Sequence, residues 1–277
     1  MEAAFNKFKG AIKPYIHKAA RRVFRIDPGY EFKPAPSIKE QSIAFEFKHH
    51  RLSIRSDHTT PLYDTIAEIV DHDCYQLEQI DFSGSADDLV LDIGAQIGTA
   101  SLVLSRLHRG RILCFEPVPE NCRFLQMNLA ANKVANATIV PAALTDRDGF
   151  AEFEIDPSSS VAGRAAGIMA TDPRVFTQSL RVKSVTLRTA LKEFSGQMIH
   201  LIKMDCEGGE YSIVDQITPD LLPRIRHMTF EVHDLNLTRN VGALTKQLTR
   251  LGFKLFYKKE MHSRVALHHL LASRVSR

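Results

Sequence analysis

Short apolar runs that end in acidic residues and glycines recur through the middle of the chain. The clearest covers residues 88–98, Asp-Leu-Val-Leu-Asp-Ile-Gly-Ala-Gln-Ile-Gly. An unbroken apolar run bounded by turn residues is typical of a parallel strand buried on both faces. Apolar side chains recur at helical spacing from Thr99 onward. The pattern therefore predicts a strand, a tight turn and a helix.

The same signals repeat toward the C-terminus. Strands are predicted at 111–117, 137–144 and 182–187, from 199 and at 227–233, and helices at 119–129, near 191, at 211–216 and at 241–251. Strands near 253–257 and 264–271 are typical of the antiparallel hairpin that closes such sheets. Strands that alternate with helices predict an α/β fold with a mostly parallel sheet.

Other stretches alternate polar and apolar residues. Residues 42–48 and 51–55 flank His49-His50 and predict a two-stranded antiparallel ribbon. A helix is expected over 61–78, before the first core strand. Residues 151–155 predict an exposed or edge strand. The aperiodic stretch 156–178 that follows predicts a lid, an acceptor-binding segment or a mobile loop.

The first 25 residues combine basic and apolar positions. Seven Lys and Arg side chains stand against one acid, Glu2, and apolar residues recur at intervals of three and four. This predicts a basic amphipathic helix, which can lie on an anionic membrane surface, dock on its own domain or contact another subunit. The predicted organisation is an extension over 1–60, holding this helix, a linker and the ribbon, and a catalytic domain over 61–277.

Composition limits the function classes. A chain of 277 residues that is 44% hydrophobic can bury one large core with a modest extension. A net charge of +4 gives no argument for a nucleic-acid partner. The four cysteines show no metal or redox spacing, and no apolar run reaches the roughly 18 residues that cross a bilayer. We expect a cytoplasmic protein, with peripheral contact at the inner membrane surface through residues 1–25 as an open alternative.

The turn after the first core strand carries candidate chemistry. Gly94 and Gly98 lie where the backbone must run close to a ligand at a helix N-terminus. Asp92, at the strand tip, would repel a diphosphate and attract an ammonium or sulfonium group. The spacing also differs from the Gly-x-Gly-x-x-Gly of dinucleotide-binding folds. The pattern favours S-adenosylmethionine as the ligand, and a purely structural glycine turn is the alternative.

The next two strands supply the rest of a nucleoside site. Glu116 follows Gly94 by 22 residues, the distance expected for a carboxylate that accepts hydrogen bonds from ribose hydroxyls. Asn121 either assists at the ribose or caps the following helix. The small residues Ala142 and Ala143 leave room for a flat ring, which would be adenine.

A second polar group ends two later strands. Asp205 and Glu207 follow one strand, with Glu210 after them, and Glu231 and His233 end the next strand. Ligands in open α/β sheets bind beyond the carboxyl ends of the strands, so these side chains are expected to converge on one crevice. Capping of helix amides by Glu207 or Glu210 is the structural alternative.

Four stretches carry a family resemblance. Residues 92–98, 115–121, 202–210 and 230–233 resemble, in this order, the signatures of FkbM-family methyltransferases. The resemblance implies a class I, Rossmann-like methyltransferase fold: a seven-stranded, mostly parallel sheet flanked by helices. It also implies S-adenosylmethionine-dependent O-methylation of a hydroxyl on a sugar, glycolipid, polyketide or related metabolite, and hence a small-molecule or glycan acceptor.

Roles can be assigned as hypotheses. Asp92 would hold the methionine amine, the backbone from Gly94 through Ala95 and Gln96 to Gly98 would cradle the methionine, and Asp205 would face the sulfonium. His233, oriented by Glu207 or Glu231, would be the base that removes the acceptor proton. No metal site is predicted, although Mg²⁺ held by Asp205, Glu231 and His233 is a variant. The rival functions are a nicotinamide-dependent oxidoreductase and a non-catalytic module that binds a membrane or partner.

Overall fold

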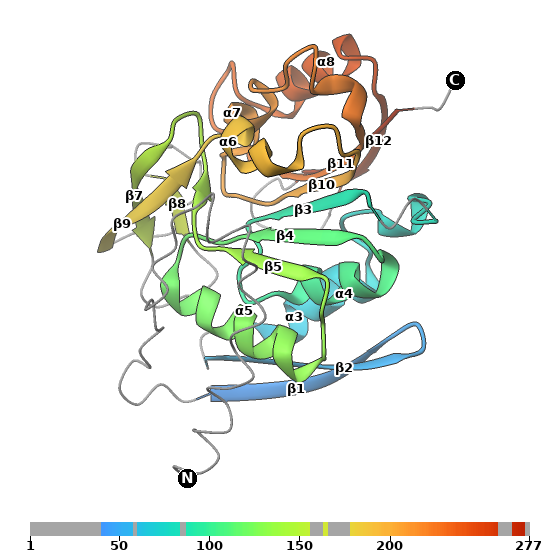
Figure 1. Ribbon diagram of the computed structural model, residues 1–277, viewed down its shortest axis with the longest axis vertical. Coiled ribbons are helices and arrows are strands. Elements are labelled where there is room, and N and C mark those ends of the chain that lie inside the picture. Colours follow the sequence, from blue (N-terminus) through green and yellow to red (C-terminus); the bar gives the residue numbers. More distant parts are fainter. Residues whose placement is uncertain are drawn as a thin grey trace.

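A seven-stranded sheet runs through the molecule in the order β12–β13–β11–β10–β3–β4–β5 (Figure 1). The computed structural model describes residues 40–57, 60–83, 87–155, 163–165, 178–259 and 268–274. The strands are β3 (Leu89–Ile93), β4 (Arg111–Phe115), β5 (Ala137–Val140), β10 (Ile199–Met204), β11 (Ile225–Val232), β12 (Lys254–Lys259) and β13 (His268–Ser273). Six strands run in the same direction, and β13 runs antiparallel to its neighbours β11 and β12. The predicted class I α/β fold is confirmed.

The strand order reverses direction between β3 and β10. From β3 the chain proceeds outward through β4 and β5, and it then returns to place β10 on the other side of β3. Such a reversal opens a crevice at the carboxyl ends of the two central strands, because the connections leave them in opposite directions. The fold thus creates a binding position between the tips of β3 and β10.

Helices cover both faces of the sheet. The helices α4 (Thr99–Leu107) and α5 (Pro119–Ala131) lie on one face, and α6 (Leu187–Ala190), α7 (Glu210–Val214) and α8 (Val241–Arg250) lie on the other (Figure 1). Successive strand residues point to opposite faces. In β3, Leu89 and Leu91 join the core under α6–α8, and Val90 joins the core under α4 and α5. The strands are apolar without interruption because both faces are buried.

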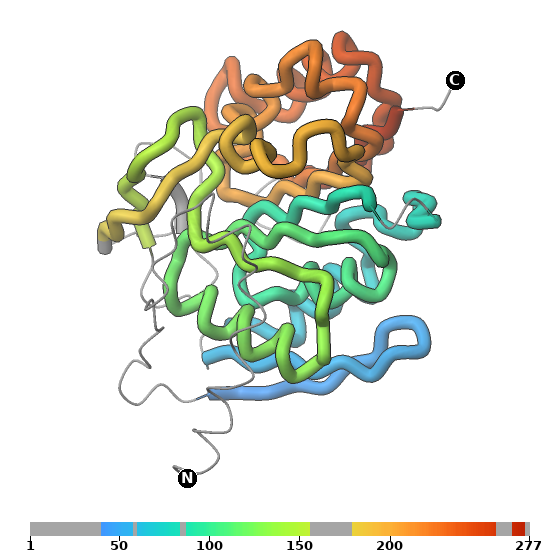
Figure 2. Tube along the Cα trace, in the orientation of Figure 1, coloured from blue at the N-terminus to red at the C-terminus, as the bar shows by residue number. Residues whose placement is uncertain are grey.

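The predicted ribbon is confirmed as β1 (Glu40–Phe47) and β2 (His50–Asp57), and it lies beside α5 (Figure 2). Two asparagine side chains, one in α5 and one at its C-terminal cap, bind the backbone of β2. Asn128 accepts from the Arg55 amide at 2.8 Å and donates to its carbonyl at 2.9 Å. Asn132 makes the equivalent pair of hydrogen bonds with Ser53. These asparagines satisfy the edge of β2 that β1 leaves open. The helix predicted over residues 1–25 lies outside the described residues.

A second, four-stranded sheet has the order β6–β9–β7–β8. Its strands are β6 (Ala143–Leu144), β7 (Gly149–Ile155), β8 (Gly163–Ala165) and β9 (Gln178–Val185). The prediction of one strand over 137–144 was therefore wrong, because the chain leaves the main sheet at Pro141 and pairs β6 with β9. Most of the predicted loop 156–178 lies outside the described residues.

The helix predicted over 61–78 is shorter than expected. The helix α3 (Leu62–Ile66) continues as a π-helical turn, η2 (Ala67–Asp71), and a separate 3-10 turn, η3 (Leu77–Gln79), follows. The Asp73 carboxylate accepts hydrogen bonds from the amides of Leu77 and Glu78, at 2.7 and 3.1 Å. An aspartate that caps a new turn competes with continuation of the helix. A loop therefore separates the two turns.

Across the described residues, every helix is too short or too polar to cross a membrane.

Candidate active site

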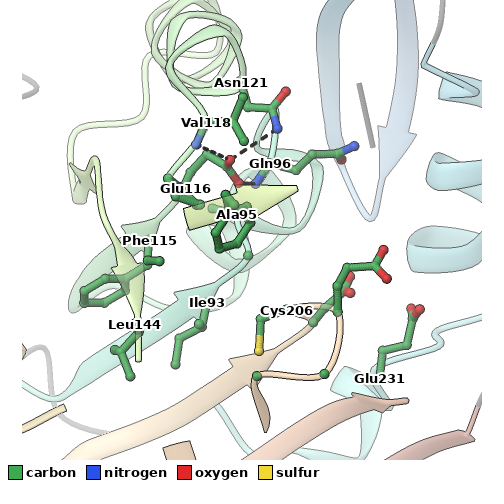
Figure 3. Close-up of a pocket in the computed structure, with 18 of the residues that line it drawn as sticks. Ile93, Ala95, Gln96, Phe115, Glu116, Val118, Asn121, Leu144, Cys206 and Glu231 are labelled. Atoms are coloured by element: carbon green, nitrogen blue, oxygen red, sulfur yellow. Dashed lines mark hydrogen bonds between the residues drawn. The ribbon is translucent and has the colours of Figure 1, made fainter. Parts of the chain in front are cut away.

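A cavity of about 750 Å³ opens at the carboxyl ends of β3, β4, β10 and β11. The strand tips contribute Gly94, Glu116, Asp205 and Glu231 to its lining. The site residues predicted from the sequence that line this cavity are Gly94, Ala95, Gln96, Glu116, Asn121, Ala142, Ala143, Asp205, Glu207 and Glu231. Figure 3 shows Glu116, Asn121 and Gln96 on one side of this space and Cys206 and Glu231 on the other. The polar strand ends therefore converge, as the sequence pattern predicts.

Glu116 organises the wall at the tip of β4 (Figure 3). One carboxylate oxygen accepts a hydrogen bond from the backbone amide of Gln96 at 2.9 Å. The other accepts from the backbone amide of Val118 at 2.9 Å and from the side chain of Asn121 at 3.2 Å. Burial raises the pKa of Glu116 to about 7, although these hydrogen bonds oppose the shift. A carboxylate can accept about four hydrogen bonds, so capacity remains for a ligand hydroxyl. Asn121 acts on Glu116 and does not cap α5.

The two glycines of the turn serve packing. A Cβ atom on Gly94 would lie 1.7 Å from the Asp205 carbonyl oxygen, and one on Gly98 would lie 2.5 Å from the Leu125 side chain. Their φ angles are 78° and 97°, which L-residues rarely adopt. Gly94 lets the tips of β3 and β10 meet. Gly98 lies outside the cavity lining and lets α4 approach α5, which corrects the prediction that it contacts the ligand.

Asp92 does not face the cavity, and this corrects its predicted role. Its side chain is fully buried, accepts from the Ser101 hydroxyl at 2.6 Å and lies 3.2 Å from the Lys203 ammonium. Lys203 also donates to the Gly94 carbonyl at 2.9 Å. The Asp92 carboxylate is turned toward this lysine because a buried charge needs a partner. It therefore acts on the site through Lys203 and cannot contact a methionine amine directly.

Asp205 lines the cavity between a lysine and a tyrosine. Its carboxylate accepts from the Tyr75 hydroxyl at 2.6 Å and lies 3.7 Å from the Lys203 ammonium. Burial would raise the pKa of the Asp205 carboxyl, but the lysine charge and the tyrosine hydrogen bond outweigh it and hold that pKa below its ordinary value. Asp205 thus presents a negative charge to the cavity.

His233 is surrounded by carboxylates. Its ring nitrogens lie 3.4 Å from Glu207, 3.2 Å from Glu210 and 3.5 Å from Glu231. Burial would lower the pKa of His233, but these three acids raise it well above the ordinary value. The three acids therefore favour the protonated, charged form of the imidazole.

This environment corrects the prediction that His233 is the base. A charged imidazole has no lone pair with which to accept a proton. His233 also lies outside the cavity lining, whereas Glu207 and Glu231 are part of it. The predicted contact between His233 and these two glutamates is confirmed, and the group that faces the cavity is a carboxylate.

Two lining residues hold an unusual backbone conformation. Gln96 has φ 51° and Glu207 has φ 52°, both in the left-handed region. This conformation costs a non-glycine residue roughly 1–2 kcal/mol. The two residues occupy the turns that follow β3 and β10, on either side of the point where the strand order reverses. Strain of this kind is concentrated at functional sites, where the surrounding structure maintains it.

The comparisons with known proteins agree with this geometry. Residues 92–255 match the model of the methyltransferase FkbM domain, which is more than half of the chain. The chain belongs to the FkbM methyltransferase family. The 31-O-demethyl-FK506 methyltransferase FkbM of Streptomyces tacrolimicus is 23% identical over an alignment of 215 residues, and the match covers 68% of this chain and 82% of that protein.

Two other comparisons are partial. The AMB antimetabolite synthetase AmbE of Pseudomonas aeruginosa is 27% identical over an alignment of 210 residues, and the match covers 63% of this chain and 10% of that protein. The chain thus spans only about a tenth of that relative. A crystal structure of methyltransferase FkbM from Methylobacillus flagellatus KT is 15% identical with a TM-score of 0.46 and covers 68% of this chain and 44% of its own.

The site contains residues that sequence reasoning missed, two of them outside the matched range 92–255. Lys203 is buried at the centre of the site, and His269 lies 3.4 Å from Glu231. Tyr75 precedes the matched domain and still reaches Asp205. A lysine inside an apolar strand is a detectable signal, because such a charge requires a buried partner. No local signal identifies Tyr75 or His269.

Among the described residues, the FkbM site offers no arrangement for a metal. Within the described ranges, no group of three or more His, Cys, Asp or Glu side chains is placed to hold a metal ion. Asp205 contacts Tyr75 and Lys203 instead. The variant in which Asp205, Glu231 and His233 bind Mg²⁺ therefore finds no support in the geometry.

Proposed function

We propose that the chain transfers the methyl group of S-adenosyl-L-methionine to a hydroxyl oxygen of a small-molecule or glycan acceptor. One observation carries the proposal: two carboxylates, Glu116, which could accept from ligand hydroxyls, and Asp205, which could attract a cation, line the same cavity at the point where the strand order reverses. A nucleoside that bears a positive charge combines the two groups that these carboxylates would bind.

The residues present fit this methyl donor. Glu116, supported by Asn121, would hold the ribose hydroxyls, and the buried pair Ala142 and Ala143 would lie against the adenine. The turn from Gly94 to Gln96 would contact the methionine part. Asp205 and the neighbouring glutamates would stabilise the cation, because a charge of opposite sign within a partly buried site is attracted strongly.

The donor, when bound, would supply a methyl group activated by the sulfonium charge. The task of the chain is then to position the acceptor oxygen and exclude water, which can lower a barrier by about 7 to 11 kcal/mol. β7 residues such as Phe150 and Phe153 form another wall of the cavity. This wall is the candidate acceptor surface.

The acceptor hydroxyl loses its proton during the transfer. Glu207 and Glu231 are the carboxylates that lie in the cavity lining on the side of His233. We assign the role of proton acceptor to one of these two carboxylates. The charged His233 would hold both carboxylates in place. The proton leaves the acceptor as the new oxygen–carbon bond forms and the sulfur–carbon bond breaks.

Titration calorimetry tests the donor. We expect S-adenosylhomocysteine to bind and NAD not to bind. Glu116→Ala should weaken S-adenosylhomocysteine binding at least about tenfold, since hydrogen bonds to a charged group are lost. Glu193→Ala, an exposed glutamate on the 3-10 turn η4 (Lys192–Phe194), is the matched control and should bind normally. Binding of NAD in place of S-adenosylhomocysteine would identify the chain as a nicotinamide-dependent protein.

The acceptor is sought by mass spectrometry. Glycans, lipids and secondary metabolites are compared in cells with the active protein and with Glu116→Ala. We expect one product that is heavier by a methyl group only with the active protein. The name of the Streptomyces relative describes methylation of an oxygen on a secondary metabolite, which supports including that class in the search.

A further inference from the structure

Tyr75 reaches the site from outside the matched FkbM domain. It lies on the loop between η2 and η3, whereas the domain match begins at residue 92. Its side chain is only 4% exposed and lines the cavity, and its hydroxyl donates to the Asp205 carboxylate at 2.6 Å across a sequence separation of 130 residues. The donor-side carboxylate thus depends on a residue from the preceding segment.

The loop that carries Tyr75 is held in a costly conformation. Asp73 and Gln76 on either side of it have φ angles of 43° and 54°. Such residues persist only when surrounding contacts over-determine them. Here the Thr229 hydroxyl of β11 donates to the Tyr75 carbonyl at 2.7 Å, and the Gln76 side chain donates to the Phe256 carbonyl of β12 at 3.3 Å. Two strands of the main sheet therefore fix where the hydroxyl points.

The Tyr75 ring also contacts Lys203 and His269. The Lys203 ammonium lies 5.0 Å from the centre of the tyrosine ring, over its face. The ring meets His269 edge-on, with 6.1 Å between centroids, and His269 lies 3.4 Å from Glu231. Tyr75 thus contacts Asp205, which would face the methyl donor. It also contacts His269, the partner of Glu231, which would face the acceptor.

We propose that Tyr75 is a positioning residue of the methyl-donor site, whose hydroxyl fixes the Asp205 carboxylate in its ionised form toward the bound cation. The inference rests on the proposed function and adds to it a residue from outside the family's domain. Tyr75 acts through Asp205 and is not itself assigned a proton transfer.

The charge environment of Asp205 makes the role measurable. The Lys203 ammonium faces it from β10, the Tyr75 hydroxyl from the loop, and His233 and His269 from β11 and β13. Burial raises the pKa of Asp205, and all four of these groups lower it. Removal of the Tyr75 hydroxyl should therefore raise the pKa and move the loss of cation binding to higher pH.

The test is calorimetric titration of the full chain with S-adenosylmethionine and with S-adenosylhomocysteine from mildly acidic to mildly alkaline pH. Tyr75→Phe keeps the ring and removes the hydroxyl. We expect S-adenosylmethionine binding to weaken about tenfold, the change that one hydrogen bond to a charged group produces. S-adenosylhomocysteine, which lacks the sulfonium charge, should lose less affinity. The acid limb of S-adenosylmethionine binding should shift to higher pH.

Two further variants complete the design. Tyr63→Phe makes the same chemical change at a tyrosine of α3 that is 76% exposed, and it should leave binding unchanged. In an Asp205→Ala background, Tyr75→Phe should have no additional effect, because a residue that acts through Asp205 has nothing left to position.

The outcomes are distinguishable. If the wild type binds S-adenosylmethionine and Tyr75→Phe matches it in affinity and pH dependence, the inference is overturned and the proposed function stands. Equal losses for both ligands with an unmoved acid limb indicate a packing role and also overturn it. If the wild type binds neither ligand, the proposed function fails and the inference fails with it.

Discussion

At the scale of single residues, left-handed backbone conformations concentrate near the cavity. Among the described residues other than glycine, φ is positive at Lys48, Asp73, Gln76, Gln96, Lys133 and Glu207. Gln96 and Glu207 line the cavity, and Asp73 and Gln76 flank Tyr75. A sequence under selection for stability alone would place glycine at such positions. Gln96 and Glu207 are therefore the positions at which the site, rather than the fold, would require a side chain.

Glu207→Gly tests this trade between stability and function. Glycine would remove the cost of the left-handed backbone, about 1–2 kcal/mol. Its greater flexibility in the unfolded state would lower the free energy of unfolding by about 0.5–1 kcal/mol. We expect the free energy of unfolding in urea to rise by about 0.5–1 kcal/mol, while S-adenosylmethionine binding weakens. Lys133→Gly, at an exposed position with φ 54°, should gain similar stability and bind normally. Normal donor binding by Glu207→Gly would show that its carboxylate has no role.

Glu116 makes donor binding dependent on pH. Burial raises its pKa to about 7. Because this folded-state pKa lies above the unfolded value, the stability that the protonated group contributes is lost as pH rises toward about 7. Ribose hydroxyls donate to the ionised carboxylate, so donor affinity should increase as pH rises toward the pKa of Glu116. At a pH below this pKa, donor binding should release protons.

Calorimetry in buffers of different ionisation enthalpy measures this proton release. We expect release in the wild type at mildly acidic pH and none in Glu116→Ala. An affinity for S-adenosylhomocysteine that stays constant across this range would contradict the assigned role of Glu116.

At the scale of elements, the site depends on how closely β3 and β10 approach at their tips. Lys203 and Asp92 face each other on paired strands, and Lys203 also donates to the Gly94 carbonyl at 2.9 Å. The turn after β3 touches the Asp205 backbone, which only the absence of a side chain at Gly94 permits. Strand pairing and the missing Cβ together set the spacing between the two sides of the cavity.

Gly94→Ala should disrupt this approach. Its Cβ would lie 1.7 Å from a backbone oxygen, which cannot rotate away. We expect a loss of about 3 kcal/mol in the free energy of unfolding in urea, at the upper end for overpacking. Gly196→Ala has a similar φ of 85° and open space around the added atom, so it should lose only about 1 kcal/mol. Equal losses in the two variants would contradict the close-approach argument.

At the scale of the whole molecule, the segment before the matched domain is part of the same structure. The β1–β2 hairpin contributes Leu52 and Ile54 to the core that also holds α4 and α5. Asn128 of α5 binds β2 and also donates to the Ile97 carbonyl in the glycine turn, at 2.8 Å. A single buried amide thus connects the hairpin to the glycine turn.

Asn128→Ala should weaken this connection. It removes three hydrogen bonds and leaves buried backbone groups unsatisfied, so we expect a loss of about 3 kcal/mol in urea denaturation. Hydrogen exchange at the Arg55 amide should accelerate. Asn132→Ala, at a more exposed position on the same helix, should lose about 1 kcal/mol because water can replace its bonds. Unchanged protection of Arg55 would contradict the docking role of Asn128.

The amino-acid sequence by itself determined the order of strands and helices and the strand ends that carry acids. Apolar runs, glycine turns and the spacing of Glu116 are local signals, and parallel strands place their carboxyl ends at one edge. Convergence of Glu116, Asp205 and Glu231 on one cavity was therefore predictable.

Only the tertiary structure decided the orientation and charge of these groups. Asp92 turns away from the cavity because Lys203 and Ser101 bind it. The stretch after β10 brings Glu207 and Glu210 to His233, beside Glu231, and these acids raise the pKa of His233. Tyr75 reaches Asp205 from 130 residues away. Side-chain direction and pKa at a strand tip depend on neighbours that are distant along the chain. Local sequence patterns cannot specify those neighbours.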